Sequence, residues 1–441
     1  MKSRPLLLLC CVALFSCGKS SSDSDDGLTY RTTFGYFLTT PDFTVPSVIM
    51  SIMSDDDLKL FETQTGTTQS AGLGFIAGRV MDGTGTPIAG VTVEAHNDSG
   101  LAAGALFYQS GTTLQFTPLL SMTSSTGRFI VMNVSQGRVN LKCASGADGN
   151  LYVRSLGNAT VFCQLNATTP VASPQPTWSG VTQNLGATGS AQPSGPEPSV
   201  VHASLGTSGL VGTSDGTTGA FNYGTVHARS THIVKCSKAL FVDTYTYIPV
   251  GTANMTSGAG GGNVLIASVA NRDAELVPAG LTLTPGTGMI RGVVLNGSGG
   301  VTVEARDSND AAVGDVRYGA NGDNGRPSDV LTASETDGFF YIYNLPPGQY
   351  LLRATKTDFA TSTYVDVFAD GITVPLNLNP QAQPQATVMI SGALASLQGF
   401  AVPKGFVTLH GMGIADSTDD FGEYTLINVP TKHLFIVRTA K

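Results

Sequence analysis

Apolar and polar residues alternate with a period of two along much of this chain. The pattern is clearest in four stretches, where a glycine-containing polar turn leads into an aromatic, an alternating run, a short turn and a second alternating run. These stretches are residues 124–143, 334–354, 417–438 and, more weakly, 216–236. A period of two rather than 3.6 predicts β-strands joined as hairpins.

A second pattern recurs upstream of these hairpins. The hexamer GVTVEA occupies residues 90–95 and again residues 300–305. Each copy follows a glycine-rich turn and an alternating strand, GFIAGRV in one case and GMIRGVV in the other. Valine and threonine at alternate positions are typical of a half-buried strand, so the chain contains a repeated β unit.

The alternation also predicts which side chains face the core. One face of each hairpin carries the large apolar residues, and the other face carries smaller or polar ones. The predicted inward residues are Phe129, Val131 and Val134 in one copy, Phe340, Ile342 and Leu345 in another, and Tyr424, Leu426 and Val429 in the last. Tyr341 and Tyr343 fall on the opposite face and are predicted to be exposed. Glycines such as Gly78, Gly292 and Gly338 mark turns or close approaches of the backbone.

The combination of GVTVEA with TDGFFYIYNLPPGQYLLRA resembles the carboxypeptidase regulatory-like domain. The resemblance is best over residues 289–357 and good over 75–143, with an insertion at 100–123. It is shorter over 387–441, and over 206–247 only the second half matches. It implies a mainly β protein made of small Greek-key, prealbumin-like sandwiches, a fold related to transthyretin-like and carbohydrate-binding-like domains.

These patterns divide the chain into six segments. Residues 166–286 combine a linker with a degenerate repeat 2, and residues 168–199 within them are rich in Pro, Ser, Gly and Thr, which favours a linker or long loop. Residues 46–62 are the best helix candidate, with Ser54 as the N-cap. The segments are a signal peptide at 1–16, a tether with a short helix at 17–73, repeat 1 at 74–165, linker plus repeat 2 at 166–286, repeat 3 at 287–380 and repeat 4 at 381–441.

The first 20 residues allow two readings. ALFSCGKS, residues 13–20, loosely matches a nucleotide-binding P-loop, but the polar, acidic sequence that follows lacks the helix such a loop needs. Lys2 and Arg4, a short apolar run and Ser16 before Cys17 instead have the layout of a secretory signal peptide. LFSC resembles the bacterial lipobox, which implies cleavage before Cys17 and lipidation of that cysteine. An unlipidated signal peptide cut near Cys17 is the alternative.

Composition restricts the partners. Loss of Lys2 and Arg4 with the signal takes the net charge from −8 to about −10, and no basic run appears, so neither nucleic acid nor nucleotide is an expected partner. The expected partner is a membrane, reached through the lipid, and a polysaccharide or another surface protein is a candidate second partner. Because Gly18 is not aspartate, resemblance to the enteric sorting rule implies the outer membrane or cell surface. Beyond Cys17, three cysteines remain; Cys143 and Cys163 are a candidate disulfide, which leaves Cys236 unpaired.

Candidate chemistry is sparse. The six histidines lack the spacing of a zinc site, although His227 and His232 are close in sequence. Ser214 is the centre of a G-x-S-x-G pattern without the strand-to-helix context of a nucleophile elbow. The loops at 306–310 and 321–325 are rich in oxygen ligands but do not match a calcium-binding loop. The sequence therefore predicts no metal and no cofactor.

The resulting hypothesis is a non-catalytic cell-surface lipoprotein whose β-sandwich modules serve display, adhesion or ligand binding. Two alternatives stay open. In the first, one module binds a polysaccharide through the face that carries Tyr341 and Tyr343. In the second, residues 168–285 hold an unrecognised hydrolase, or an accessory module of one, with Ser214 as the first residue to test.

Overall fold

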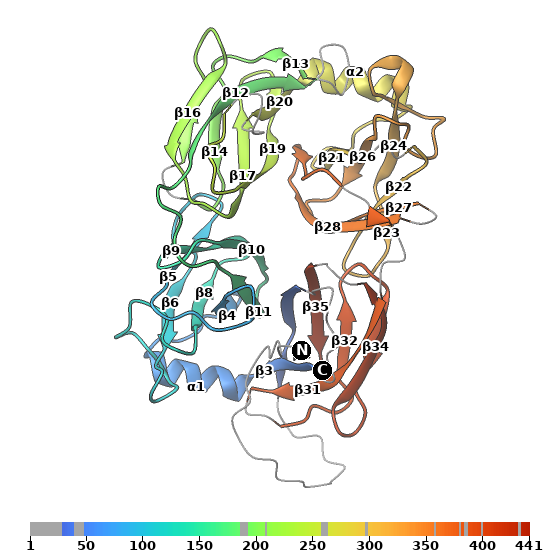
Figure 1. The fold of residues 1–441 in the computed structure, drawn as a ribbon. Helices are drawn as coiled ribbons and strands as arrows, with labels where there is room; N and C mark the ends of the chain where they lie inside the picture. The colour runs from blue at the N-terminus through green and yellow to red at the C-terminus, as the bar shows by residue number, and fades with distance from the viewer. Residues whose placement is uncertain are drawn as a thin grey trace, which may run out of the picture. The chain divides into compact units, whose positions relative to one another are not determined.

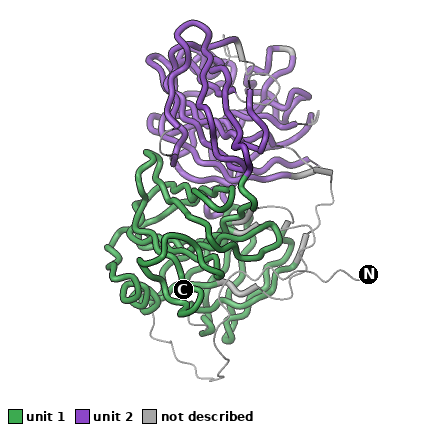
Figure 2. The backbone as a smooth tube through the Cα atoms, turned by 60° about the vertical axis from the view of Figure 1, so that its left-hand side comes forward, with its two compact units in different colours: residues 1–171, 386–441 green, residues 172–385 purple. Residues whose placement is uncertain are grey.

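A computed structural model describes residues 29–38, 48–185, 193–207, 210–256, 263–295, 299–356, 359–378, 381–382, 387–397, 400–430 and 434–441. These residues are mainly β, as the sequence predicts. The chain forms two compact units, unit 1 from residues 1–171 and 386–441 and unit 2 from residues 172–385 (Figure 2). Unit 1 therefore takes both ends of the chain.

Among its described residues, unit 1 contains one helix and two groups of strands far apart in sequence (Figure 1). The N-terminal elements are β1 (Tyr30–Arg31), β2 (Thr33–Leu38), β3 (Val48–Ser54), α1 (Asp55–Thr65), β4 (Gly74–Met81), β5 (Thr92–Asn97), β6 (Ala105–Gln109), β7 (Phe116–Thr117), β8 (Arg128–Val134), β9 (Gly137–Ser145), β10 (Asn150–Ser155) and β11 (Thr160–Asn166). The C-terminal elements are β31 (Thr387–Ser396), β32 (Phe406–Leu409), β33 (Ile414–Ser417), β34 (Glu423–Pro430) and β35 (Leu434–Ala440).

Unit 2 is continuous in sequence. Its first half holds β12 (Thr177–Leu185), β13 (Pro193–Pro196), β14 (Val201–Ser204), β15 (Val211–Thr213), β16 (Ala220–Thr225), β17 (Ser230–Ser237), β18 (Phe241–Val242), β19 (Thr244–Val250) and β20 (Val264–Ser268). Its second half holds α2 (Val269–Ala279), β21 (Gly288–Val293), β22 (Thr302–Arg306), β23 (Ala312–Val313), β24 (Asp315–Ala320), η1 (Asn321–Asp323), β25 (Arg326–Ser328), β26 (Phe339–Leu345), β27 (Gly348–Lys356), β28 (Phe359–Val367), β29 (Ile372–Val374) and β30 (Gln381–Ala382).

The two units repeat one architecture. Each has a nine-stranded sheet, ordered β33-β32-β35-β2-β11-β4-β8-β6-β7 in unit 1 and β15-β14-β17-β19-β29-β21-β26-β24-β25 in unit 2. The two orders correspond strand for strand. A parallel pair at the middle of each sheet, β2 with β11 and β19 with β29, joins two β-sandwiches. We number the sandwiches by chain order: sandwich 1 (74–166), sandwich 2 (177–268), sandwich 3 (288–374) and sandwich 4 (387–440 with 30–54).

Sandwich 4 is completed by the N-terminal strands. β2 pairs antiparallel with β35 from Thr33↔Thr439 to Leu38↔Leu434, and β3 pairs parallel with β31. In sandwich 2 the same places are taken by β19 and β20, which follow β17 closely in the chain. Residues 30–54, which the sequence analysis assigned to a tether, therefore contribute strands to the C-terminal sandwich, and Figure 1 shows β2 and β3 beside β35 and β31.

The repeated hairpins owe their shape to two local features. A Cβ on Gly78 would lie 2.1 Å from the Phe129 ring, and one on Gly292 would lie 2.3 Å from the Phe340 ring, so only glycine leaves room for the aromatic. Each hairpin also carries a β-bulge at an asparagine with left-handed backbone, at φ values of 58°, 57° and 58°. These residues are Asn133, Asn344 and Asn428. Asparagine tolerates this conformation better than most residues, which explains its recurrence.

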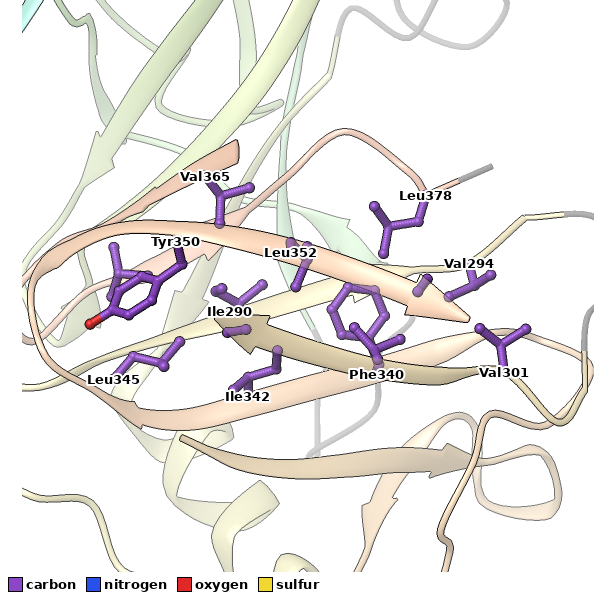
Figure 3. Close-up of a cluster of buried hydrophobic side chains, with 14 of the residues drawn as sticks. Ile290, Val294, Val301, Phe340, Ile342, Leu345, Tyr350, Leu352, Val365 and Leu378 are labelled. Carbon is purple, nitrogen blue, oxygen red and sulfur yellow. The ribbon is translucent and has the colours of Figure 1, made fainter. Parts of the chain in front are cut away.

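The predicted inward residues are buried in all three copies. Each of the nine is at most 2% exposed. Figure 3 shows the core of sandwich 3, where Phe340 and Ile342 from β26 point toward Leu352 and Val365 of the opposite sheet. Alternation along single strands was therefore sufficient to identify these cores.

Two sequence-based assignments are wrong in part. The helix predicted at 46–62 begins only after Ser54, because residues 48–54 form β3, a strand between β1 and β31 whose apolar run lacks alternation. Ser54 does cap the helix, and its hydroxyl accepts a hydrogen bond from Asp57 N. The linker predicted at 168–199 contains β12, in which Trp178 is fully buried. Its neighbours Gly180 and Thr182 are small or polar, which hid the alternation.

Candidate functional site

Tyr341 and Tyr343, the residues proposed from sequence as an exposed ligand face, are both fully buried. They do point away from Phe340 and Ile342, as alternation requires, but they join a second apolar cluster with Ala279 of α2. Because α2 packs over this outer face of sandwich 3, the two tyrosines cannot present a binding surface. Alternation correctly separated the two faces of β26 but did not reveal the helix that covers one of them.

Beneath α2 the tyrosines surround a buried ion pair. Glu275 on α2 and Arg291 on β21 approach to 2.6 Å, and their side chains are 1% and 4% exposed. The Arg291 guanidinium lies over the Tyr341 ring, 5.5 Å from its centre, and the Tyr341 and Tyr343 rings stack nearly parallel. The Tyr341 hydroxyl donates to the carbonyl of Gly325 at 2.6 Å. These four side chains form the Glu275–Arg291 cluster.

The position of the Glu275–Arg291 cluster follows from local sequence. Ser268 caps α2 by accepting from Asn271 N, and Gly280 ends it with a left-handed backbone at φ 65°. This places Glu275 on the buried side of the helix. Arg291 pairs in register with Tyr341, directly across the strand pair β21–β26. Arg291 within the apolar strand β21 was the one signal in the sequence, because Glu275 lies on a helix that also carries Arg272 and Asp273.

Burial controls the electrostatics of the cluster. Removal from water raises the pKa of Glu275 to about 7, although the neighbouring Arg291 acts in the opposite direction. Burial likewise raises the pKa of Tyr341 and of Tyr343 above the ordinary value. With both charged side chains almost fully enclosed, the cluster is closed to a substrate, and it connects α2 to β21 of the sandwich.

The remaining residues singled out in the sequence serve the interior. Cys143 pairs with Val93 in one sheet and Cys163 with Gly78 in the other sheet of sandwich 1, so the proposed disulfide is not formed and both cysteines are buried. Burial raises the pKa of Cys143 to about 12, which disfavours a reactive thiolate. Cys236 is also buried and free. Cys17 lies outside the described residues.

Ser214 and His232 also have structural hydrogen bonds. Ser214 is 3% exposed; its hydroxyl accepts from Val200 N at 2.9 Å and donates to the Glu197 carbonyl at 3.2 Å. His232 lies within hydrogen-bond distance of two serine hydroxyls, Ser204 at Nδ1 and Ser230 at Nε2. Both ring nitrogens of His232 thus lie at serine hydroxyls, so His232 does not form a metal site with His227.

In the described ranges, no group of three or more His, Cys, Asp or Glu side chains is placed to hold a metal ion. In the loop at 306–310, the Asp310 carboxylate is engaged by the Arg306 guanidinium at 2.9 Å. Neither α1 nor α2, the α-helices of the described chain, is long and apolar enough to cross a membrane.

Comparison with known proteins identifies no family. No family model matches the chain, and no curated protein matches it. Among solved structures, the Bacillus anthracis TIE protein aligns over 70% of this chain and 51% of its own length, at 10% identity and a TM-score of 0.17. BcpA, the major pilin subunit of Bacillus cereus, in its D312A form, aligns over 69% of this chain and 99% of its own, at 10% identity and a TM-score of 0.15. The Streptococcal ancillary pilin aligns over 70% of this chain and 100% of its own, at 10% identity and a TM-score of 0.15.

This chain thus spans about half the length of the TIE protein.

Proposed function

We propose that the protein is a non-catalytic, lipid-anchored cell-surface protein whose four sandwiches display a binding or adhesive surface away from the membrane. The observation that carries the proposal is the N-terminal sequence, in which LFSC ends at Cys17 and a polar stretch separates that cysteine from β1. A mature N-terminal cysteine bearing several acyl chains would anchor the protein stably, whereas one chain would bind only marginally.

Two further observations favour a scaffold over an enzyme. Ser214, which a sequence pattern offered as a nucleophile, and His232, considered as a metal ligand, are used inside sandwich 2 as structural hydrogen-bond partners. The tyrosines offered as a polysaccharide platform are enclosed under α2. A surface role in display or adhesion, with a protein partner, fits this architecture better than the carbohydrate-binding or hydrolase alternatives.

Acyl labelling of cells that express the protein tests the anchor. We expect Cys17→Ser to abolish incorporation of a labelled fatty acid and to leave unprocessed precursor, while the matched variant Cys11→Ser, six residues upstream in the apolar run, stays labelled. Protease treatment of intact cells then tests display, because a surface protein is digested and an inward-facing one is protected. Persistent labelling of Cys17→Ser would overturn the anchor, and protection in intact cells would overturn display.

A further inference from the structure

Unit 2 contains a pocket of about 250 Å³, which is lined by residues outside the Glu275–Arg291 cluster. It lies between the end of β18, the first turns of α2, the segment that leads into β21 and the turn before β29. Its floor is apolar and its rim carries an arginine and an aspartate. The residues that define it are Val242, Arg272, Leu283, Thr287, Met289 and Asp370.

Unit 1 shows what fits at the equivalent place. β1 pairs with β3 as β18 pairs with β20, and the register puts Arg31 opposite Met53 where unit 2 has Val242 opposite Ala267. Arg31 is 9% exposed, and its Nε donates to the carbonyl of Asn158 at 3.0 Å. A buried guanidinium of the chain itself therefore occupies unit 1 at the position where the shorter valine leaves space in unit 2.

The turns at Asn158 in unit 1 and at Asp370 in unit 2 are equivalent, because the same hydrogen bond is present in each. Asn158 Oδ1 accepts from Gly72 N at 2.8 Å, and Asp370 Oδ1 accepts from Gly286 N at 2.8 Å. The backbone carbonyl that receives Arg31 in unit 1 thus has a counterpart at Asp370. Unit 2 also replaces the neutral amide of Asn158 by a carboxylate at that turn, which adds a negative charge beside the open space.

The charges around the pocket favour a cation. Arg272 at the rim is engaged by its neighbour Asp273, whose Oδ1 lies 2.8 Å from Nε and 2.7 Å from a terminal nitrogen. Asp370 is exposed, so its carboxylate is open to solvent at the pocket mouth. The guanidinium of Arg272 and the carboxylates of Asp273 and Asp370 together give the pocket mouth a net charge of −1. A planar guanidinium matches a carbonyl and a carboxylate together better than a compact ammonium does.

We propose that this pocket binds a guanidinium group from outside the chain, held by the carbonyl and carboxylate of Asp370 with its stem against Val242 and Met289. The volume lies below the range typical of drug-sized ligands, so the occupant is one side-chain-sized group. The source is either a small guanidinium compound or an arginine side chain of a partner protein. The inference rests on the duplication of the two units and does not depend on lipid anchoring or surface display.

Methyl NMR of the purified protein tests the proposal. We expect N-acetyl-arginine amide to shift the methyl signals of Met289 and Ile372 saturably, with a dissociation constant on the order of millimolar. The neutral isostere N-acetyl-citrulline amide should leave them unchanged. An arginine-centred pentapeptide that binds more tightly than the single residue would assign the source to a protein partner, and equal affinity would assign it to a small molecule.

Two variants check the position of the ligand. Val242→Arg should fill the pocket as Arg31 does in unit 1 and abolish the shifts, and Asp370→Asn should weaken binding about two- to fivefold, as expected for an exposed charge pair. Asp370→Asn keeps the oxygen that accepts from Gly286, so the turn is preserved and this variant stays informative if Val242→Arg fails to fold. Equal shifts from the citrulline probe, or no saturation by 100 mM arginine amide, would overturn the proposal.

Discussion

The outer faces of sandwiches 1 and 3 occupy equivalent places in the two units, and each is covered by an 11-residue helix. Under α1 the contact is apolar: Phe61 lies 5.4 Å from the rings of both Phe75 and Phe116. Under α2 the contact is the Glu275–Arg291 cluster. The strand pairs β4–β8 and β21–β26 have the same register: Ala77 pairs with Ile130 in unit 1 where Arg291 pairs with Tyr341 in unit 2.

This comparison teaches that the architecture requires a covering helix but not a particular chemistry beneath it. An apolar contact gains stability from every buried side chain independently. A buried ion pair gains little overall once the cost of removing both charges from water is counted, but loss of one partner is costly because the other charge is left without water or a counter-ion. The two units therefore differ in how they respond to substitution and to pH.

Arg291→Ala should have the largest effect. Loss of the cation leaves Glu275 buried without its partner, and we expect the free energy of unfolding of unit 2 to fall by about 3–5 kcal/mol. Urea unfolding monitored by tryptophan fluorescence reports the free energy of unfolding of unit 2 selectively, because Trp178 is the only tryptophan in the chain and lies in unit 2. Arg353→Ala, which removes an exposed arginine of β27, is the control and should change the value by less than about 0.5 kcal/mol. Equal effects of the two variants would contradict a structural ion pair.

The pH dependence of unit 2 should show the next largest effect. Burial raises the pKa of Glu275 to about 7, so the folded chain holds this proton more tightly than the unfolded chain. Its contribution is fully present below about pH 4.5 and is lost as the pH rises through 7, a change of about 3 kcal/mol. Unfolding of the parent and of Glu275→Gln at several pH values isolates this contribution. Parallel stability curves would show that Glu275 does not titrate in this range.

Asn344→Ala should lower the stability of unit 2 by about 2 kcal/mol. The side chain accepts from Thr284 N and donates to the Thr282 carbonyl and to the Asp315 carboxylate, and the bulge holds its backbone at φ 57°. Alanine loses all three hydrogen bonds and is strained in this conformation. Asn344→Gly relieves the strain and should recover about half of the loss. If alanine and glycine behave alike, backbone strain is not part of the effect.

The smallest change is expected from Glu275→Phe combined with Arg291→Ala, which gives unit 2 the residues of unit 1 at both positions. Removing both charges together leaves neither uncompensated, so the stability should stay within about 1 kcal/mol of the parent. Comparison with Arg291→Ala alone completes the test by the same fluorescence measurement. A double variant as unstable as the single one would mean that Tyr341 and Tyr343 require the charges to pack.

The same two helices show how far sequence reasoning reached. Ser54 and the acidic first turn located α1, but the apolar run before it concealed β3, whose partners lie at the far end of the chain. α2 was not recognised, because Pro278 and a mixed face weaken its periodicity. Sequence reasoning also missed Glu275 and Arg291, since their pairing is a contact between a helix and a strand without any fixed spacing.

The sequence by itself determined the strands of the repeated hairpins and their inward residues, because alternation acts between positions only two residues apart along one strand. The tertiary structure alone decided that β2 and β3 complete sandwich 4 and that Tyr341 and Tyr343 are buried. Pairing between distant strands uses backbone groups common to every residue, so it leaves no local signature. Burial of an outward face depends on which other element lies over it, and that is set by the fold of the whole unit.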